Sequence, residues 1–192
     1  MNLNNLFGYS RKDLDEVIIG RESYLTKKGF SPEFFLGQAF GADTNERSYN
    51  HFLAQAILNA RTYFGEDIPA IVQAEIGSCL GNLGVSGAFF HQIGEVYQSG
   101  KRSLVISKMS TKEVLTESKY VLNNLGLSYH SALFVAHPYH MERVLHIAES
   151  IGILGEPFVR KGVEWPKEDL QPWVRSPFVF VPREIIARII NR

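Results

Sequence analysis

The stretch Leu133-Phe-Val-Ala-His-Pro-Tyr-His-Met-Glu-Arg143 decides the fold of this chain. Residues 133–136 are apolar throughout, as in a strand that is buried on both faces. Pro138 then suits the first turn of a helix, and residues 138–151 carry apolar side chains at helical spacing. A buried strand that turns directly into an amphipathic helix is typical of α/β proteins with a parallel sheet.

The same alternation continues on both sides of this stretch. The expected strands are 34–40, 70–74, 104–107, 131–136 and, at a sheet edge because of its proline, 156–160. The expected helices are 10–28, 46–64, 88–98, 111–125, 138–151 and 183–191, whereas the glycine-rich residues after 74 predict a loop. We therefore expect an α/β fold: a three-layer, Rossmann-like domain around a mostly parallel sheet of about five strands.

The length of 192 residues suits one domain with a sizeable core. We expect residues 1–192 to form that single domain, with its core at about 33–160. The helix 10–28 and the aromatic, proline-rich tail 161–192 would pack on this core. The sequence leaves open whether the tail is part of the core or an interface between two copies.

Charge and composition exclude several classes of function. The 20 basic residues balance 20 acidic ones, so nothing favours binding to nucleic acid or to an anionic membrane. Near-zero net charge leaves a homodimer open. Cys79 is the only cysteine, and no apolar run approaches the ~20 residues of a membrane span. The N-terminal residues lack the features of a signal peptide, so we expect a cytoplasmic protein.

The turn at residues 137–143 is the main candidate site. The C-terminal ends of parallel strands face the ligand, and a helix that begins there favours an anion. His140 and Arg143 are three residues apart and so share a helix face, and an arginine fork suits phosphate or carboxylate. His137 could bind a ligand too. In the structural alternative, His137 caps the helix and Arg143 pairs with a surface acid.

Other strand ends supply weaker candidates. Glu75 directly follows the second strand, but the glycines after it match neither a dinucleotide fingerprint nor a P-loop. Arg47 follows the first strand as a second candidate cation, while Asp43 and Thr44 have the character of helix caps. Glu117 would face either inward or solvent. The six histidines include no metal-binding pattern, so no metal site is expected.

The segment 132–144 resembles the YdcF/SanA/ElyC-like family of domains of unknown function, whose members have a Rossmann-like α/β fold. The shared pattern is a strand, a polar turn, a Tyr-His pair and an arginine, here Tyr139, His140 and Arg143. Weaker matches are Gly41 and Arg47 after the first strand, Glu75 and Gly77 after the second, and Thr116-Glu117. The resemblance implies that these positions bind ligand, with S-adenosylmethionine or a nucleotide as the cofactor class.

We therefore expect a protein that binds a nucleotide-like or phosphorylated small molecule at the C-terminal strand ends. Arg47, His140 and Arg143 would hold the anion, while Glu75 and His137 would donate hydrogen bonds or act as general acid and base. If the protein is an enzyme, the expected reaction is group transfer or hydrolysis. The alternative is a non-catalytic ligand-binding or regulatory module that acts as a homo-oligomer.

Overall fold

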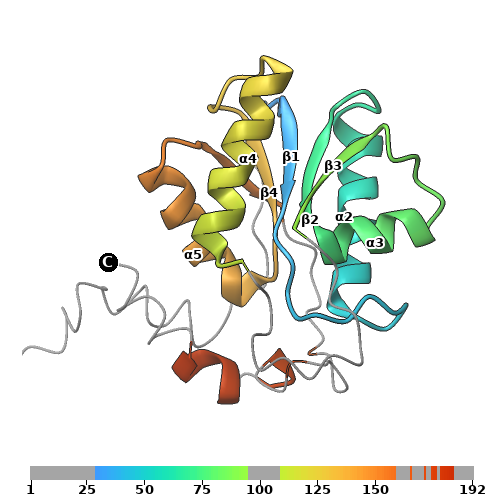
Figure 1. The fold of residues 1–192 in the computed structure, drawn as a ribbon, viewed down its shortest axis with the longest axis vertical. Coiled ribbons are helices and arrows are strands. Elements are labelled where there is room, and N and C mark those ends of the chain that lie inside the picture. The colour runs from blue at the N-terminus through green and yellow to red at the C-terminus, as the bar shows by residue number, and fades with distance from the viewer. Residues whose placement is uncertain are drawn as a thin grey trace, which may run out of the picture.

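The structure is a computed structural model that describes residues 29–94, 109–158, 165, 171, 174–176 and 178–183. Strands and helices alternate along these residues, as Figure 1 shows. The strands are β1 (Phe34–Gly37), β2 (Ala70–Gln73), β3 (Phe90–Ile93), β4 (Ala132–Val135) and β5 (Gly155–Phe158). The helices are α2 (Tyr49–Phe64), α3 (Ala74–Asn82), α4 (Thr111–Leu125) and α5 (Pro138–Ser150). The expected α/β class is confirmed.

The five strands form one sheet in the order β3-β2-β1-β4-β5, and every pairing is parallel. The central strand β1 pairs on both sides, with Gly37 in register with Val72 of β2 and Val135 of β4. The C-terminal ends of all five strands therefore meet at one edge, which is the lower edge in Figure 1. β5 lies at the side of the sheet and contains Pro157, as expected for an edge strand.

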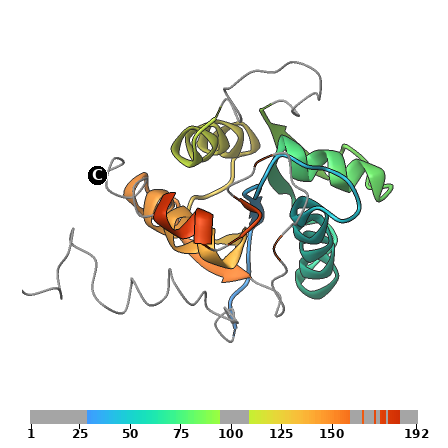
Figure 2. The ribbon, with the colours of Figure 1, turned by 90° about the horizontal axis from the view of Figure 1, so that it is seen from below.

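Helices cover both faces of the sheet, which makes three layers (Figure 2). Alternate residues of a strand point to opposite faces, and the core divides in the same way. Phe35 packs in the cluster that contains residues of α2 and α3, whereas Phe34 and Leu36 pack with residues of α4 and α5. The central strands are apolar at almost every position because both of their faces are buried.

Local signals explain where several helices begin and end. Ser110 and Glu113 form a reciprocal capping box at the start of α4, and Gly126 ends that helix in the left-handed region with φ of 67°. Pro138 occupies the first turn of α5, as expected. For α2 the cap is Ser48, whose side chain accepts a hydrogen bond from the backbone N–H of His51. Neither Asp43 nor Thr44 is the cap of α2.

Two expectations between residues 74 and 98 were wrong. Residues 74–82 form α3 and not a loop, because Ile76, Cys79 and Leu80 make an apolar stripe that is buried against the core. Residues 90–93 form β3 and not part of a helix, because they pair in parallel with β2. Glycines in α3 and a mixed sequence in β3 hid both elements, since the packing that stabilises them involves distant residues.

Some expectations fall outside the described residues. These are the helix 10–28, the strand 104–107 and most of the helix 183–191. Of the tail 161–192, Trp165, Val174 and Phe180 pack against the core cluster on the α2/α3 side, and a helix covers residues 178–183. These tail residues therefore contribute to the core. No helix in the described part of the chain is long and apolar enough to cross a membrane.

Candidate functional site

The turn after β4 lies at the point where the strand order reverses. The chain leaves β1 through α2 toward β2, and it leaves β4 through α5 toward β5 on the other side of the sheet. The connections from these adjacent strands therefore diverge at the C-terminal edge. In open α/β sheets this switch point is where ligands bind. The segments that follow the two strands begin with Gln38 and Ala136.

His137 begins α5 as its N-cap and is fully buried. Its Nδ1 accepts a hydrogen bond from the backbone N–H of Tyr139 at 3.2 Å, so the proton of the neutral ring resides on Nε2. The ring stacks on Phe40, with centroids 3.6 Å apart and planes 10° from parallel. Burial lowers the pKa of His137 well below its usual value, because charge is disfavoured there. The geometry matches the capping alternative.

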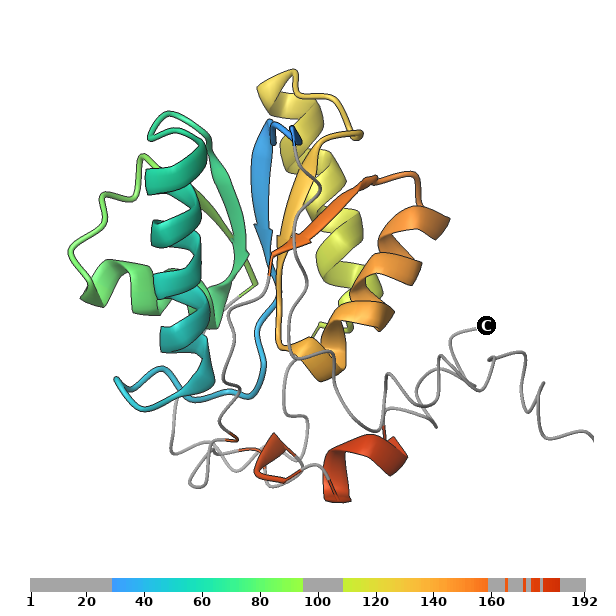
Figure 3. The same ribbon diagram turned by 180° about the vertical axis from the view of Figure 1, so that it is seen from behind.

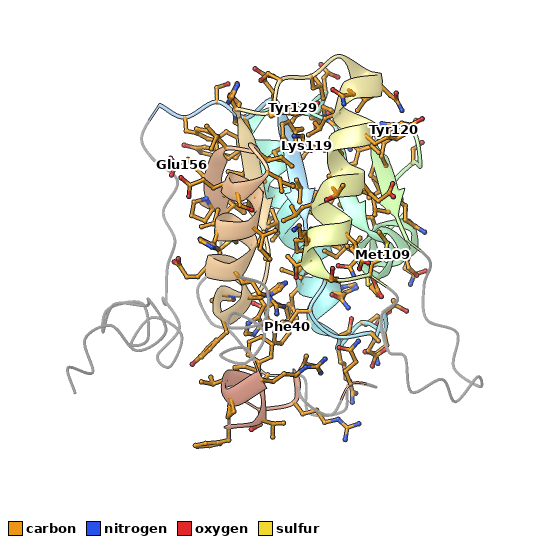
Figure 4. The ribbon with its side chains drawn as sticks, turned by 60° about the vertical axis from the view of Figure 1, so that its left-hand side comes forward. Phe40, Met109, Lys119, Tyr120, Tyr129 and Glu156 are labelled. Atoms are coloured by element: carbon orange, nitrogen blue, oxygen red, sulfur yellow. The ribbon has the colours of Figure 1, made fainter. Side chains whose placement is uncertain are left out.

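Aromatic side chains surround His137 on the α2/α3 side of the switch point. Tyr49 of α2 lies 4.4 Å and Trp165 of the tail 4.9 Å from His137, measured between ring centroids. Phe180 packs on Phe40 at 4.9 Å. Figure 3 shows the helix 178–183 below the C-terminal ends of the strands, and Figure 4 shows Phe40 above that helix. The chain's own tail therefore covers this side, which we call the aromatic side.

The opposite side of the switch point carries a polar cluster made of Thr111, His140 and Arg143. Arg143 Nη2 lies 3.0 Å from His140 Nδ1, and His140 Nε2 lies 3.4 Å from Thr111 Oγ1. A guanidinium can only donate, so Nδ1 of His140 accepts from Arg143 and Nε2 carries the proton. His140 thereby connects the first turn of α5 with the first residue of α4. We call this the polar side.

Two helix N-termini and a guanidinium thus meet on the polar side. The dipoles of α4 and α5 favour negative charge at these ends of the helices, although the backbone N–H groups of Tyr139 and His140 already bond to His137. Arg143 adds a full positive charge. This combination can hold an anion. The sequence predicted His140 and Arg143 correctly as neighbours, but it assigned Thr111 only to helix capping.

The loop after β1 is organised by Asn50, which the sequence gave no reason to single out. Asn50 Oδ1 accepts from the N–H of Phe40 at 2.8 Å, and Nδ2 donates to the carbonyls of Gly41 and Asp43. Gly41 has φ of 88°, which favours glycine. Arg47 is exposed in this loop, and its backbone N–H donates to Asn45 Oδ1. The structure does not bring Arg47 into the polar cluster.

The remaining candidates lie apart from the polar cluster. Glu75 is buried in the first turn of α3 and acts electrostatically on Cys79, whose thiol donates to the carbonyl of Thr44 at 3.4 Å. Burial raises the pKa of Cys79 to about 11, so this thiol is protonated near neutral pH. A Cβ at Gly77 would meet the side-chain oxygen of Gln92 at 2.6 Å, so that glycine serves the contact between α3 and β3.

Glu117 and Tyr139 occupy different surroundings. Glu117 is exposed on α4 six residues beyond Thr111, so it lies about 9 Å farther along the helix axis than Thr111. Tyr139 is partly buried and packs edge-to-face on Trp165 at 4.9 Å, on the aromatic side. The structure thus brings His140 and Arg143 together with Thr111, and it places the other sequence candidates elsewhere.

Comparisons with protein-family models, with curated proteins and with solved structures give no match to this chain. Among the described residues, no group of three or more histidine, cysteine, aspartate or glutamate side chains is placed to hold a metal ion.

Proposed function

We propose that this chain binds a phosphorylated or nucleotide-like small molecule at the C-terminal ends of β1 and β4, on the polar side. The observation that supports this is the hydrogen-bonded series Arg143–His140–Thr111, which joins the N-termini of α5 and α4. The resemblance to the YdcF/SanA/ElyC-like family implies the same ligand class. The proposal includes a cytoplasmic location, because phosphorylated metabolites are abundant there.

In this proposal each residue has a separate task. Arg143 supplies the charge that attracts the anion, and its guanidinium donates to it. His140 fixes the guanidinium through Nδ1 and presents an Nε2–H donor beside Thr111. The first turn of α4 adds backbone N–H donors. If the bound molecule reacts, His140 is the general acid best placed for proton transfer, and His137 is not, because it is buried under aromatic rings.

The test is a binding panel of inorganic phosphate, adenosine 5′-monophosphate, adenosine triphosphate and S-adenosylmethionine. A ligand present at 100 times its dissociation constant should stabilise the protein by about 2.7 kcal/mol in a thermal or urea melt. Arg143→Gln should abolish this stabilisation. Arg47→Gln is the matched control, since Arg47 is exposed and lies outside the cluster, and it should retain the stabilisation.

Two outcomes would count against the proposal. One is a melting temperature of the wild-type protein that no compound in the panel changes. The other is equal ligand stabilisation of the wild type and of Arg143→Gln. Melts of both variants without ligand separate a loss of binding from a loss of fold.

A further inference from the structure

Gln38 is a buried polar residue that the proposed function does not yet use. It directly follows β1, its side chain is 1% exposed, and its Nε2 has no hydrogen-bond partner in the part of the chain that the structure describes. A buried amide donor without a partner destabilises a fold. Such a donor requires an explanation, and at a switch point ligand binding is one.

The position of the Gln38 side chain follows from the sheet. The parallel ladder continues to Gln38, since its backbone N–H donates to the carbonyl of Val135 at 2.9 Å. Side chains alternate along a strand, so Gln38 lies on the same face as Phe34 and Leu36. Both of these residues pack in the cluster formed with α4 and α5. Gln38 therefore faces the polar side.

The helices place Gln38 beside the polar cluster. α4 packs on β2 and β3, and α5 packs on β4 and β5, so the central strand β1 lies beneath the space between the two helices. At the C-terminal edge this space is bridged by the contact between Thr111 and His140. From this topology, Gln38 at the end of β1 lies on the sheet beneath that bridge. The site then has donors from the sheet as well as from both helices.

We infer that Gln38 binds the ligand, with its amide N–H donating to an oxygen of a phosphoryl group held by Arg143. This inference rests on the proposed function and narrows it. A planar carboxylate is satisfied by one arginine fork. A phosphoryl group has three terminal oxygens that point in different directions, and donors from the sheet and both helices match that shape. The inference therefore favours a phosphate ester over the carboxylate of S-adenosylmethionine.

The test combines affinity and stability in the full chain, with adenosine 5′-monophosphate and S-adenosylmethionine as probes for calorimetric titration. Gln38→Met keeps the volume of the side chain and removes the amide. It should weaken binding of adenosine 5′-monophosphate at least about tenfold, since a hydrogen bond to a charged group is lost. Without ligand, the same variant should melt at or above the wild-type temperature, because it removes an unpaired buried donor.

Gln73→Met is the matched control. Gln73 ends the neighbouring strand β2, and its Oε1 accepts a hydrogen bond from the N–H of Ala39 at 3.2 Å. This variant loses a satisfied hydrogen bond, so it should lower the melting temperature. It should leave the affinity for adenosine 5′-monophosphate within about twofold, because its amide already has a partner.

The possible results separate the inference from the proposed function. Equal affinity of Gln38→Met and wild type for adenosine 5′-monophosphate overturns the inference and leaves the proposed function standing. A wild-type protein that binds S-adenosylmethionine but not adenosine 5′-monophosphate also overturns the inference and leaves the proposed function standing. A melting temperature of Gln38→Met as low as that of Gln73→Met shows a structural amide and also overturns it. Absence of binding to both probes and to the other compounds of the panel overturns both proposals.

Discussion

The two sides of the switch point differ sharply although one short segment, residues 137–143, contributes to both. On the aromatic side, His137 is buried among rings from α2, the loop after β1 and the tail. On the polar side, His140 bonds to Arg143 and contacts Thr111. Two histidines that are three residues apart therefore have opposite roles. His137 stabilises the start of α5, and His140 presents polar groups at the end of the sheet.

The largest effect should come from breaking the aromatic side. Phe40 is 2% exposed and contacts His137, Tyr49, Trp165 and Phe180. Phe40→Ala should lower the free energy of unfolding by about 3–5 kcal/mol, because it removes a buried ring and leaves a cavity. Urea denaturation would measure the loss.

The control for this substitution is Phe178→Ala in the helix 178–183, where the ring is 89% exposed. That change should alter the free energy of unfolding by no more than about 0.5 kcal/mol. A loss below about 1 kcal/mol for Phe40→Ala would contradict the interpretation that the aromatic side is a well-packed core.

The sequence predicted those parts of this arrangement that depend on local signals. The strands near 34–37, 70–73 and 132–135 contain the apolar runs 34–36, 70–72 and 132–135, and α4 and α5 have clear starts at Ser110 and Pro138. Residues 74–82 were misjudged, because glycine suggests a loop unless the tertiary contacts of Ile76 and Leu80 are known, and so were residues 90–93. Each of these failures concerns an element that is stabilised mainly by distant residues.

The residues of the candidate site were likewise predictable only where local sequence signals determine their neighbours. His140 and Arg143 were predictable because their spacing on a helix makes them neighbours. Gln38 and Asn50 were not, because their importance comes from strand register and from a loop that only the folded chain defines. His137 was predictable as a cap, but its burial under Trp165 and Phe40 depends on a tail residue 28 positions away.

The next largest effect should come from acid pH, which should destabilise the packing on the aromatic side. His137 is neutral in the folded protein because burial lowers its pKa, whereas in the unfolded chain it gains a proton below about pH 6.5. The unfolded state therefore binds more protons in acid, so the stability contributed by neutral His137 is complete above pH 6.5 and decreases below it. Lowering the pH from 7.5 to 5.5 should therefore decrease the free energy of unfolding by up to about 1.4 kcal/mol through this group.

The measurement is urea denaturation at both pH values for the wild type and for His137→Asn. Asparagine can also cap a helix, but it does not titrate, so the variant removes only the proton-linked part of the pH dependence. The wild type should lose more stability in acid than the variant does. Equal losses would show that His137 is not the group responsible and would weaken the contrast between the two sides.

The smallest effect should come from the polar side, through Thr111. Thr111→Val keeps the branched shape and the helix propensity while it removes the hydroxyl that contacts His140 at 3.4 Å. We expect a loss of about 0.5–1 kcal/mol in the free energy of unfolding, as for a neutral hydrogen bond, measured by urea denaturation.

Thr116→Val on the exposed face of α4 is the control, since the Thr116 hydroxyl bonds only to the carbonyl of Lys112 on its own helix. If both variants lose the same amount, the contact between α4 and α5 adds nothing to stability. The polar side would then be distinguished from the aromatic side by its charge and not by a bond that joins the two helices.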